Sequence, residues 1–83
     1  MIEEAIQKAA VTLLLDVANG SIAAIDALGA WPDVWDQEPK LAWARHCLQH
    51  FAADQDIRAY DPAYDRIQRA ELQQLAADIS AAT

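Results

Sequence analysis

Hydrophobic residues recur every three or four positions over most of the chain, which is the spacing that places side chains on one face of an α-helix. The first such stretch runs from Ile2 to Ala18 and is apolar on two sides. Its main apolar stripe consists of Ile2, Ile6, Ala9, Leu13 and Val17. Ala10 and Leu14 lie at the edge of this stripe, on its shoulder. The opposite side has Val11, Leu15 and Ala18. Such a helix packs either between other helices of its own fold or against a second chain, and both alternatives remain open.

Two short segments follow the first helix. Asn19-Gly20 predicts the end of that helix, because glycine adopts the left-handed conformation that closes many helices, and Ser21 is a suitable N-cap for a new segment. Three-residue spacing then predicts a short helix or 3₁₀ turn that ends at Gly29, with Ile22, Ile25 and Leu28 as its apolar residues. The next residues, from Ala30 to Asp36, hold two tryptophans around a proline and predict a structured loop.

The central stretch, from Asp36 to Asp54, predicts a helix with two distinct faces. One face is expected to be core and consists of Leu41, Ala44, Leu48 and Phe51. The second face consists of Trp43, His46, Cys47, His50 and Asp54. Asp36 or Glu38 is expected to cap this helix, with Pro39 in its first turn. The helix either stops near Ala53 or frays beyond it, and we expect a turn around residues 55–60.

The last segment begins with the strongest local signal in the chain, Asp61-Pro62, because aspartate is a good N-cap and proline suits the first helical position. The helix is predicted to run from Pro62 to about Ala81. Its apolar stripe consists of Tyr64, Ile67, Leu75, Ile79 and Ala82, and Leu72 lies at the edge of this stripe. Gln68 and Glu71 fall inside this stripe. Either their polar heads reach solvent from a half-covered stripe, or they form an interhelical or intersubunit hydrogen-bond site.

These elements predict an all-α fold, a small compact bundle of three longer helices plus one short helical segment. Residues 1–83 are expected to form a single helical domain, because no Gly/Ser-rich linker, repeat or low-complexity segment divides them. A homodimer through the first or last helix is a further alternative, since a domain of this size buries a limited core.

Charge and cysteine content narrow the function. The chain has 13 acidic and 6 basic side chains and a net charge of −7. Direct binding to nucleic acid or to an anionic membrane surface is therefore disfavoured, because both need clustered Lys or Arg. The single cysteine excludes an internal disulfide, the first residues lack the positive charge of a secretory signal, and the apolar run from Ala9 to Leu15 is too short to span a bilayer. We therefore expect a cytoplasmic protein.

Aromatic and acidic residues between positions 31 and 54 form the candidate protein-binding site. Tryptophans often dominate the energy of such sites, and charges steer the encounter. The candidate residues are Trp31, Asp33, Trp35, Asp36, Glu38, Trp43, His46, His50 and Asp54. The alternative is that the loop folds back and Trp31 or Trp35 packs on Trp43 in the core. We expect two of the three tryptophans to be core and one to be partly exposed.

Metal and thiol chemistry are weaker alternatives. His46 and His50 have the i, i+4 spacing with which a helix presents two ligands to one zinc ion, and Asp54 lies one turn further. Such a site would need further ligands from carboxylates or a second chain, so we expect no metal and no cofactor. Cys47 is expected to be a small, partly buried hydrophobe rather than a nucleophile. No catalytic constellation is visible, and we expect no enzyme.

The main functional hypothesis is a small acidic inhibitor or modulator that binds a partner protein. One version masks the basic nucleic-acid-binding surface of its partner, as phage counter-defence proteins of the anti-CRISPR kind do, an analogy that rests on size and charge alone. The alternatives are an immunity protein or antitoxin that neutralises a basic toxin, a structural or regulatory helical homo-oligomer, and a protein with a His/Cys metal or redox site.

Overall fold

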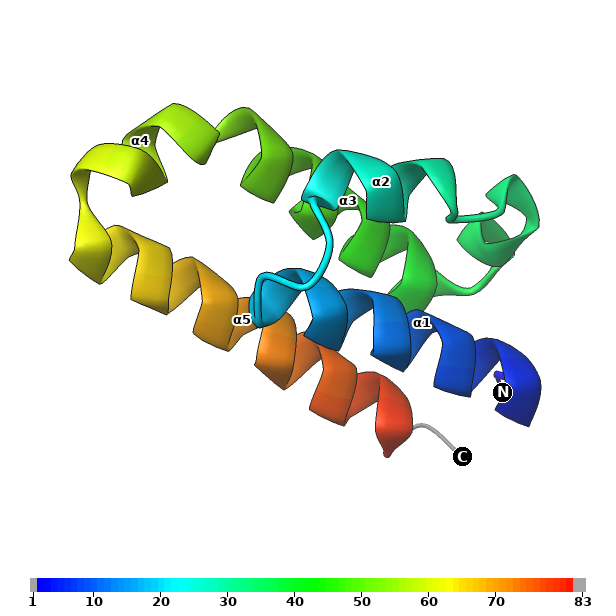
Figure 1. The fold of residues 1–83 in the computed structure, drawn as a ribbon. Coiled ribbons are helices and arrows are strands. Elements are labelled where there is room, and N and C mark those ends of the chain that lie inside the picture. The colour runs from blue at the N-terminus through cyan, green and yellow to red at the C-terminus, as the bar shows by residue number, and fades with distance from the viewer. Residues whose placement is uncertain (1, 82–83) are drawn as a thin grey trace.

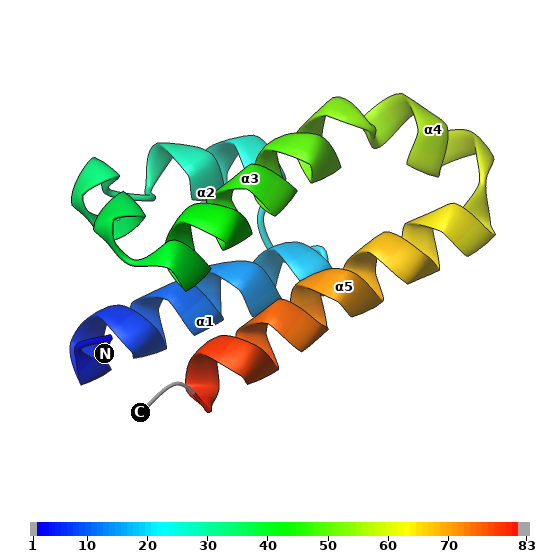
Figure 2. The same cartoon turned by 180° about the vertical axis from the view of Figure 1, so that it is seen from behind.

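Three long helices make up most of the fold: α1 (Glu4–Ala18), α3 (Pro39–Ala53) and α5 (Pro62–Ser80). The computed structural model describes residues 2–81, in which two short helices, α2 (Ala24–Gly29) and α4 (Gln55–Tyr60), and a 3₁₀ helix, η1 (Asp33–Gln37), connect them. Helices α1 and α5 lie side by side and antiparallel, and α3 with α2 covers this pair (Figures 1 and 2). The predicted all-α bundle is therefore confirmed. It differs from the prediction in detail, since η1 lies in the expected loop and α4 replaces the turn expected at 55–60.

Local signals set most helix ends. Gly20 has a φ of +83°, and the amides of Ser21 and Gly20 donate to the carbonyls of Asp16 (2.8 Å) and Val17 (3.1 Å). These two bonds form a Schellman motif, so the predicted end of α1 is confirmed. Ser21 is not an N-cap, because α2 begins after Ala23 and the Ser21 hydroxyl donates to Asn19 instead.

The other two N-termini follow the proline signals. Asp61 caps α5 and accepts a 3.1 Å hydrogen bond from the amide of Tyr64, as predicted. Glu38 occupies the N-cap position of α3 without a side-chain cap bond. Asp36, the other expected cap, accepts a hydrogen bond from Arg45 instead.

The core combines a correct prediction for α3 with corrections for α1. All four residues of the predicted α3 core face are buried: Leu41, Ala44, Leu48 and Phe51. In α1 the two shoulder residues, Ala10 and Leu14, are fully buried, while Ala9 is exposed. Ala18, expected on the opposite side, is also buried. The physical reason is that α1 packs against α5 and α2 together, so the face between these neighbours becomes core.

The face that α5 presents to the core also differs from the prediction. Leu72, expected at the edge, is buried together with Ala76 and Ile79, whereas Ile67 is 57% exposed. Helix α5 packs against both α1 and α3. The face of α5 that points toward these two helices is therefore buried, and this is not the face with the most large apolar residues. Ala82 lies outside the described residues.

Two of the three tryptophans complete the core, as predicted. Trp31 is 3% and Trp35 is 9% exposed, whereas Trp43 is 57% exposed. The alternative arrangement, in which one of them packs on Trp43, does not occur. Trp31 and Trp35 pack edge to face on each other instead, with ring centroids 5.0 Å apart.

Within residues 2–81, no helix combines the length and the apolar composition that a membrane span requires.

Candidate functional site

The second face of α3 borders α5, and the two helices form a groove with two shallow hollows. One has a volume of about 330 Å³ and is lined by Pro39, Lys40, Trp43, Leu75, Asp78 and Ile79. The other has about 230 Å³ and is lined by Trp43, His46, Cys47, His50, Phe51, Gln68, Glu71 and Leu72. Trp43 lines both hollows, and we call this surface the Trp43 groove.

An aromatic row runs along the α3 side of the Trp43 groove. The rings of Trp43 and His46 are 5.3 Å apart between centroids, and those of His46 and His50 are 4.4 Å apart in an edge arrangement. All three side chains are exposed. The structure therefore brings together three of the predicted protein-binding residues on one helix face.

The α5 side of the groove is acidic and apolar. Glu71 and Asp78 are exposed there, and neither forms an ion pair with any residue that the structure describes. Leu75 is half-buried in the groove. An exposed aromatic row on one helix thus faces carboxylates on the other.

Asp54 closes one end of the aromatic row and turns toward α5. Its Oδ2 accepts hydrogen bonds from the Tyr64 hydroxyl (2.7 Å) and from Nε2 of Gln68 (3.0 Å). These bonds lower the pKa of Asp54. Gln68 is thus an interhelical hydrogen-bonding residue, whereas Glu71, the other polar residue of the predicted α5 stripe, is exposed. Within residues 2–81, no group of three or more His, Cys, Asp and Glu side chains is placed to hold a metal ion.

The remaining predicted residues lie elsewhere. Asp33 and Asp36 both form ion pairs with Arg45, at N–O distances of 3.6 Å and 2.5 Å. Glu38 is the N-cap residue of α3. Trp31 and Trp35 are buried in the core, so they do not present their rings to a partner. The predicted cluster thus separates into the Trp43 groove, an Asp33/Asp36/Arg45 ion-pair group and a buried tryptophan pair.

Cys47 sits at the floor of the groove and is half-buried. Burial raises the pKa of its thiol, and the nearby negative charge of Glu71 raises it further. A nucleophilic cysteine needs the opposite environment, one that stabilises the thiolate.

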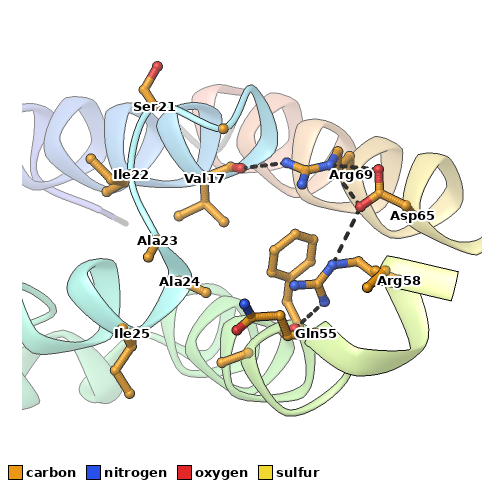
Figure 3. A pocket seen from close by; sticks show the side chains of 14 residues that line it. Val17, Ser21, Ile22, Ala23, Ala24, Ile25, Gln55, Arg58, Asp65 and Arg69 are labelled. Atoms are coloured by element: carbon orange, nitrogen blue, oxygen red, sulfur yellow. Dashed lines mark hydrogen bonds and ion pairs between the residues drawn. The ribbon is translucent and has the colours of Figure 1, made fainter. Parts of the chain in front are cut away.

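A second, larger cavity lies where the end of α1, the start of α2, the end of α3, α4 and α5 meet (Figure 3). It has a volume of about 780 Å³, and we call it the Arg58 cleft. Its polar wall is formed by Arg58, Arg69, Asp65 and Gln55, and its apolar wall includes Val17, Ile22, Ala24 and Phe51. The sequence reasoning missed this site.

Arg58 of α4 is held by contacts from two other helices, α3 and α5. Its side chain is only 8% exposed, and its guanidinium carbon lies 3.4 Å from the centroid of the Phe51 ring. Nη1 donates to the carbonyl of Phe51 and to Oε1 of Gln68, and Nε lies 3.5 Å from a carboxylate oxygen of Asp65. Burial lowers the pKa of Arg58, and the neighbouring charge of Arg69 lowers it further.

Arg69 completes the polar wall of the cleft. Its Nε donates to Asp65 at 3.0 Å, and its Nη1 donates to the carbonyls of Val17 and Ala18 at 3.1 Å each. Asp65 is therefore the carboxylate shared by both arginines. The i, i+4 spacing of Asp65 and Arg69 is visible in the sequence, but no sequence signal connects this pair with Arg58 or Phe51.

Comparison of the chain with protein-family models, with curated proteins and with solved structures found no match in any of the three. The chemistry of the two sites is therefore the basis for a functional proposal.

Proposed function

We propose that the protein is a non-catalytic module that binds a basic surface of a partner protein through the Trp43 groove. One observation supports this most directly. Trp43, 57% exposed, stands between two hollows whose α5 walls contain Asp78 and Glu71.

The exposure of Trp43 favours a binding role. A large aromatic side chain gains free energy when it leaves water, and tryptophan is enriched among the residues that dominate protein interfaces. The hollows of about 330 and 230 Å³ beside it give a partner two places for side chains.

The charges favour a basic partner. A Lys or Arg of the partner placed over the Trp43 ring would gain a cation–π contact and would lie near Glu71 or Asp78. The net charge of −7 would attract a basic surface at long range and raise the association rate at low salt.

In the specific version of this proposal, the partner's basic surface normally binds nucleic acid, and the protein blocks it, as anti-CRISPR proteins block their targets. An immunity protein or antitoxin against a basic toxin would use the same charges with another partner. In both versions, Trp43 contributes most of the binding free energy, and the carboxylates of Glu71 and Asp78 make the affinity depend on salt.

The test is a pull-down from a nuclease-treated bacterial lysate, with elution by rising salt and identification by mass spectrometry. We expect a basic nucleic-acid-binding protein to elute at moderate salt, and its nucleic-acid binding to be inhibited by the added protein. Trp43→Ala and the double variant Glu71→Gln/Asp78→Asn should lose both effects. Matched controls are Val34→Ala, which shortens another exposed apolar side chain, and Glu3→Gln/Asp26→Asn, which removes the same charge outside the groove. Equal losses in test and control variants would contradict the proposal.

Self-association is the second candidate, because Ile67 on α5 is as exposed as Trp43 and would favour burial against a second copy. Light scattering over a wide concentration range separates the two candidates. A dimer in the wild type that becomes monomeric in both Trp43→Ala and Ile67→Ser would assign the exposed apolar side chains of Trp43 and Ile67 to self-association instead of a basic partner.

A further inference from the structure

The Arg58 cleft shares Phe51 with the Trp43 groove but contains none of the three residues of the aromatic row, and the proposed partner binding does not use it. We propose that it binds a small monocarboxylate with an aliphatic tail, with the carboxylate at Arg58 and Arg69 and the tail on the apolar wall.

The polar wall has hydrogen-bonding capacity to spare. Arg58 uses Nη1 and Nε, and Arg69 uses Nε and Nη1, for the contacts described above. The Nη2 atom of neither arginine has a hydrogen-bond partner among residues 2–81. Figure 3 shows both guanidinium groups reaching into the cleft from α4 and α5, opposite the residues that follow α1. Arginine is suited to carboxylates because its N–H groups lie in one plane at matching spacing.

The charge balance selects a singly charged anion. Two guanidinium groups share the carboxylate of Asp65, so the wall keeps a net positive charge inside an acidic protein. The two arginines also repel one another, and burial together with that repulsion lowers the pKa of Arg58. An added carboxylate would relieve this repulsion, whereas a doubly charged phosphate would exceed the remaining positive charge.

The opposite wall selects an apolar tail. Val17, Ala24 and Phe51 are buried and Ile22 is half-buried, and all four line the cleft. The Phe51 ring lies 3.4 Å from the guanidinium carbon of Arg58. Val17, Ile22 and Ala24 extend the hydrocarbon surface of the cleft from there (Figure 3). A volume of about 780 Å³ lies within the range of small-molecule sites.

The probe is sodium hexanoate, followed by ¹H–¹⁵N NMR of the full chain at constant ionic strength. We expect saturable shifts confined to residues around the cleft. Acetate should bind at least tenfold more weakly, because each buried methylene contributes roughly a fourfold gain in affinity. 1-Hexanol, which has the same tail without the charge, should also bind at least tenfold more weakly than hexanoate.

A variant that leaves the arginine contacts intact provides a second test. Ala59 is exposed and lines the cleft, so Ala59→Glu places a repelling carboxylate at its edge. We expect at least a tenfold loss of hexanoate affinity. Ala5→Glu makes the same change on the exposed face of the first turn of α1, outside the cleft, and should bind hexanoate as the wild type does.

Three results would overturn the proposal. The first is linear, non-saturating shifts with hexanoate. The second is equal affinity for hexanoate and 1-hexanol, which would show that the arginines play no part. The third is tighter binding of inorganic phosphate than of hexanoate, which would assign the cleft to phosphoryl groups. The comparisons among hexanoate, acetate, hexanol and phosphate use the wild-type chain only, so they remain decisive if Ala59→Glu fails to fold.

Discussion

The Nε2 atom of Gln7 in α1 donates a 2.6 Å hydrogen bond to the carbonyl oxygen of Ile79 in the last turn of α5. The same atom donates to the carbonyl of Ser80 at 2.9 Å. At the other end of the pair, Arg69 of α5 donates to the carbonyls of Val17 and Ala18 in the last turn of α1. Each helix thus donates side-chain hydrogen bonds to carbonyl groups in the last turn of its antiparallel neighbour, where the regular hydrogen bonds between successive turns of the helix end.

Replacing Gln7 by Leu is expected to lower the free energy of unfolding by about 1–3 kcal/mol, because the Ile79 carbonyl loses the donor of a buried hydrogen bond. Gln7 is only 7% exposed, so water has little access to replace the bond. Urea unfolding followed by circular dichroism measures the change. Gln49→Leu, on the exposed face of α3, is the control and should change stability by less than about 0.5 kcal/mol. An unchanged urea midpoint for Gln7→Leu would show that the bond does not stabilise the helix pair.

Replacing Asp65 by Asn is expected to lower the free energy of unfolding by about 1–3 kcal/mol, because Arg58 and Arg69 lose their shared counter-charge. The loss is smaller than for a fully buried ion pair, since the Asp65 side chain is 28% exposed and solvent screens its charge. It should shrink further in 1 M NaCl, which screens the repulsion between the arginines. The control, Asp26→Asn, removes an exposed carboxylate without an ion pair in the described chain. Equal losses in both variants would rule out a special role for Asp65.

The Asp54–Tyr64 hydrogen bond predicts a pH dependence at both extremes. The pKa of Asp54 is lowered by the bonds from Tyr64 and Gln68, so its contribution to stability is complete above its unfolded pKa and is lost as the pH falls through its folded pKa. The pKa of Tyr64 is raised by the bond to Asp54, so its contribution is complete below its unfolded pKa and is lost as the pH rises through its folded pKa.

Urea unfolding between pH 2 and 11 tests both effects. Asp54→Asn should be less stable than the wild type at neutral pH, and the difference should narrow below about pH 4. Tyr64→Phe should differ from the wild type at neutral pH, and that difference should narrow above about pH 10. Differences that stay constant over the whole range would mean that neither group changes its pKa on folding.

Cys47 is expected to react slowly with a disulfide reagent such as 5,5′-dithiobis(2-nitrobenzoate) at pH 8. The raised pKa leaves less thiolate, and partial burial restricts access. Unfolding in urea should increase the rate, and Glu71→Gln should increase it moderately in the folded protein by removing a nearby negative charge. A folded rate equal to the unfolded rate would contradict the described environment.

The predictions that were confirmed depend on short-range chemistry. The core face of α3 follows from spacing within one helix, the end of α1 from the conformational freedom of Gly20, and the start of α5 from Asp61-Pro62. The sequence also predicted that two of the three tryptophans would be buried and one exposed, but not which one. The site was predicted only in part: Trp43, His46 and His50 meet because they share one helix face, whereas the contact of Trp31 with Trp35 depends on how the loop folds.

The positions of the long helices could be read from the chain alone, because caps, breaks and periodicities act over a few residues. The buried faces of α1 and α5 could not, because both helices have apolar residues on more than one side and their neighbours in the fold select among them. The burial of Gln7 and the stacking of Arg58 on Phe51 likewise depend on packing. These polar contacts join residues from different helices, and their free energy depends on donors and acceptors that meet only after the helices have packed.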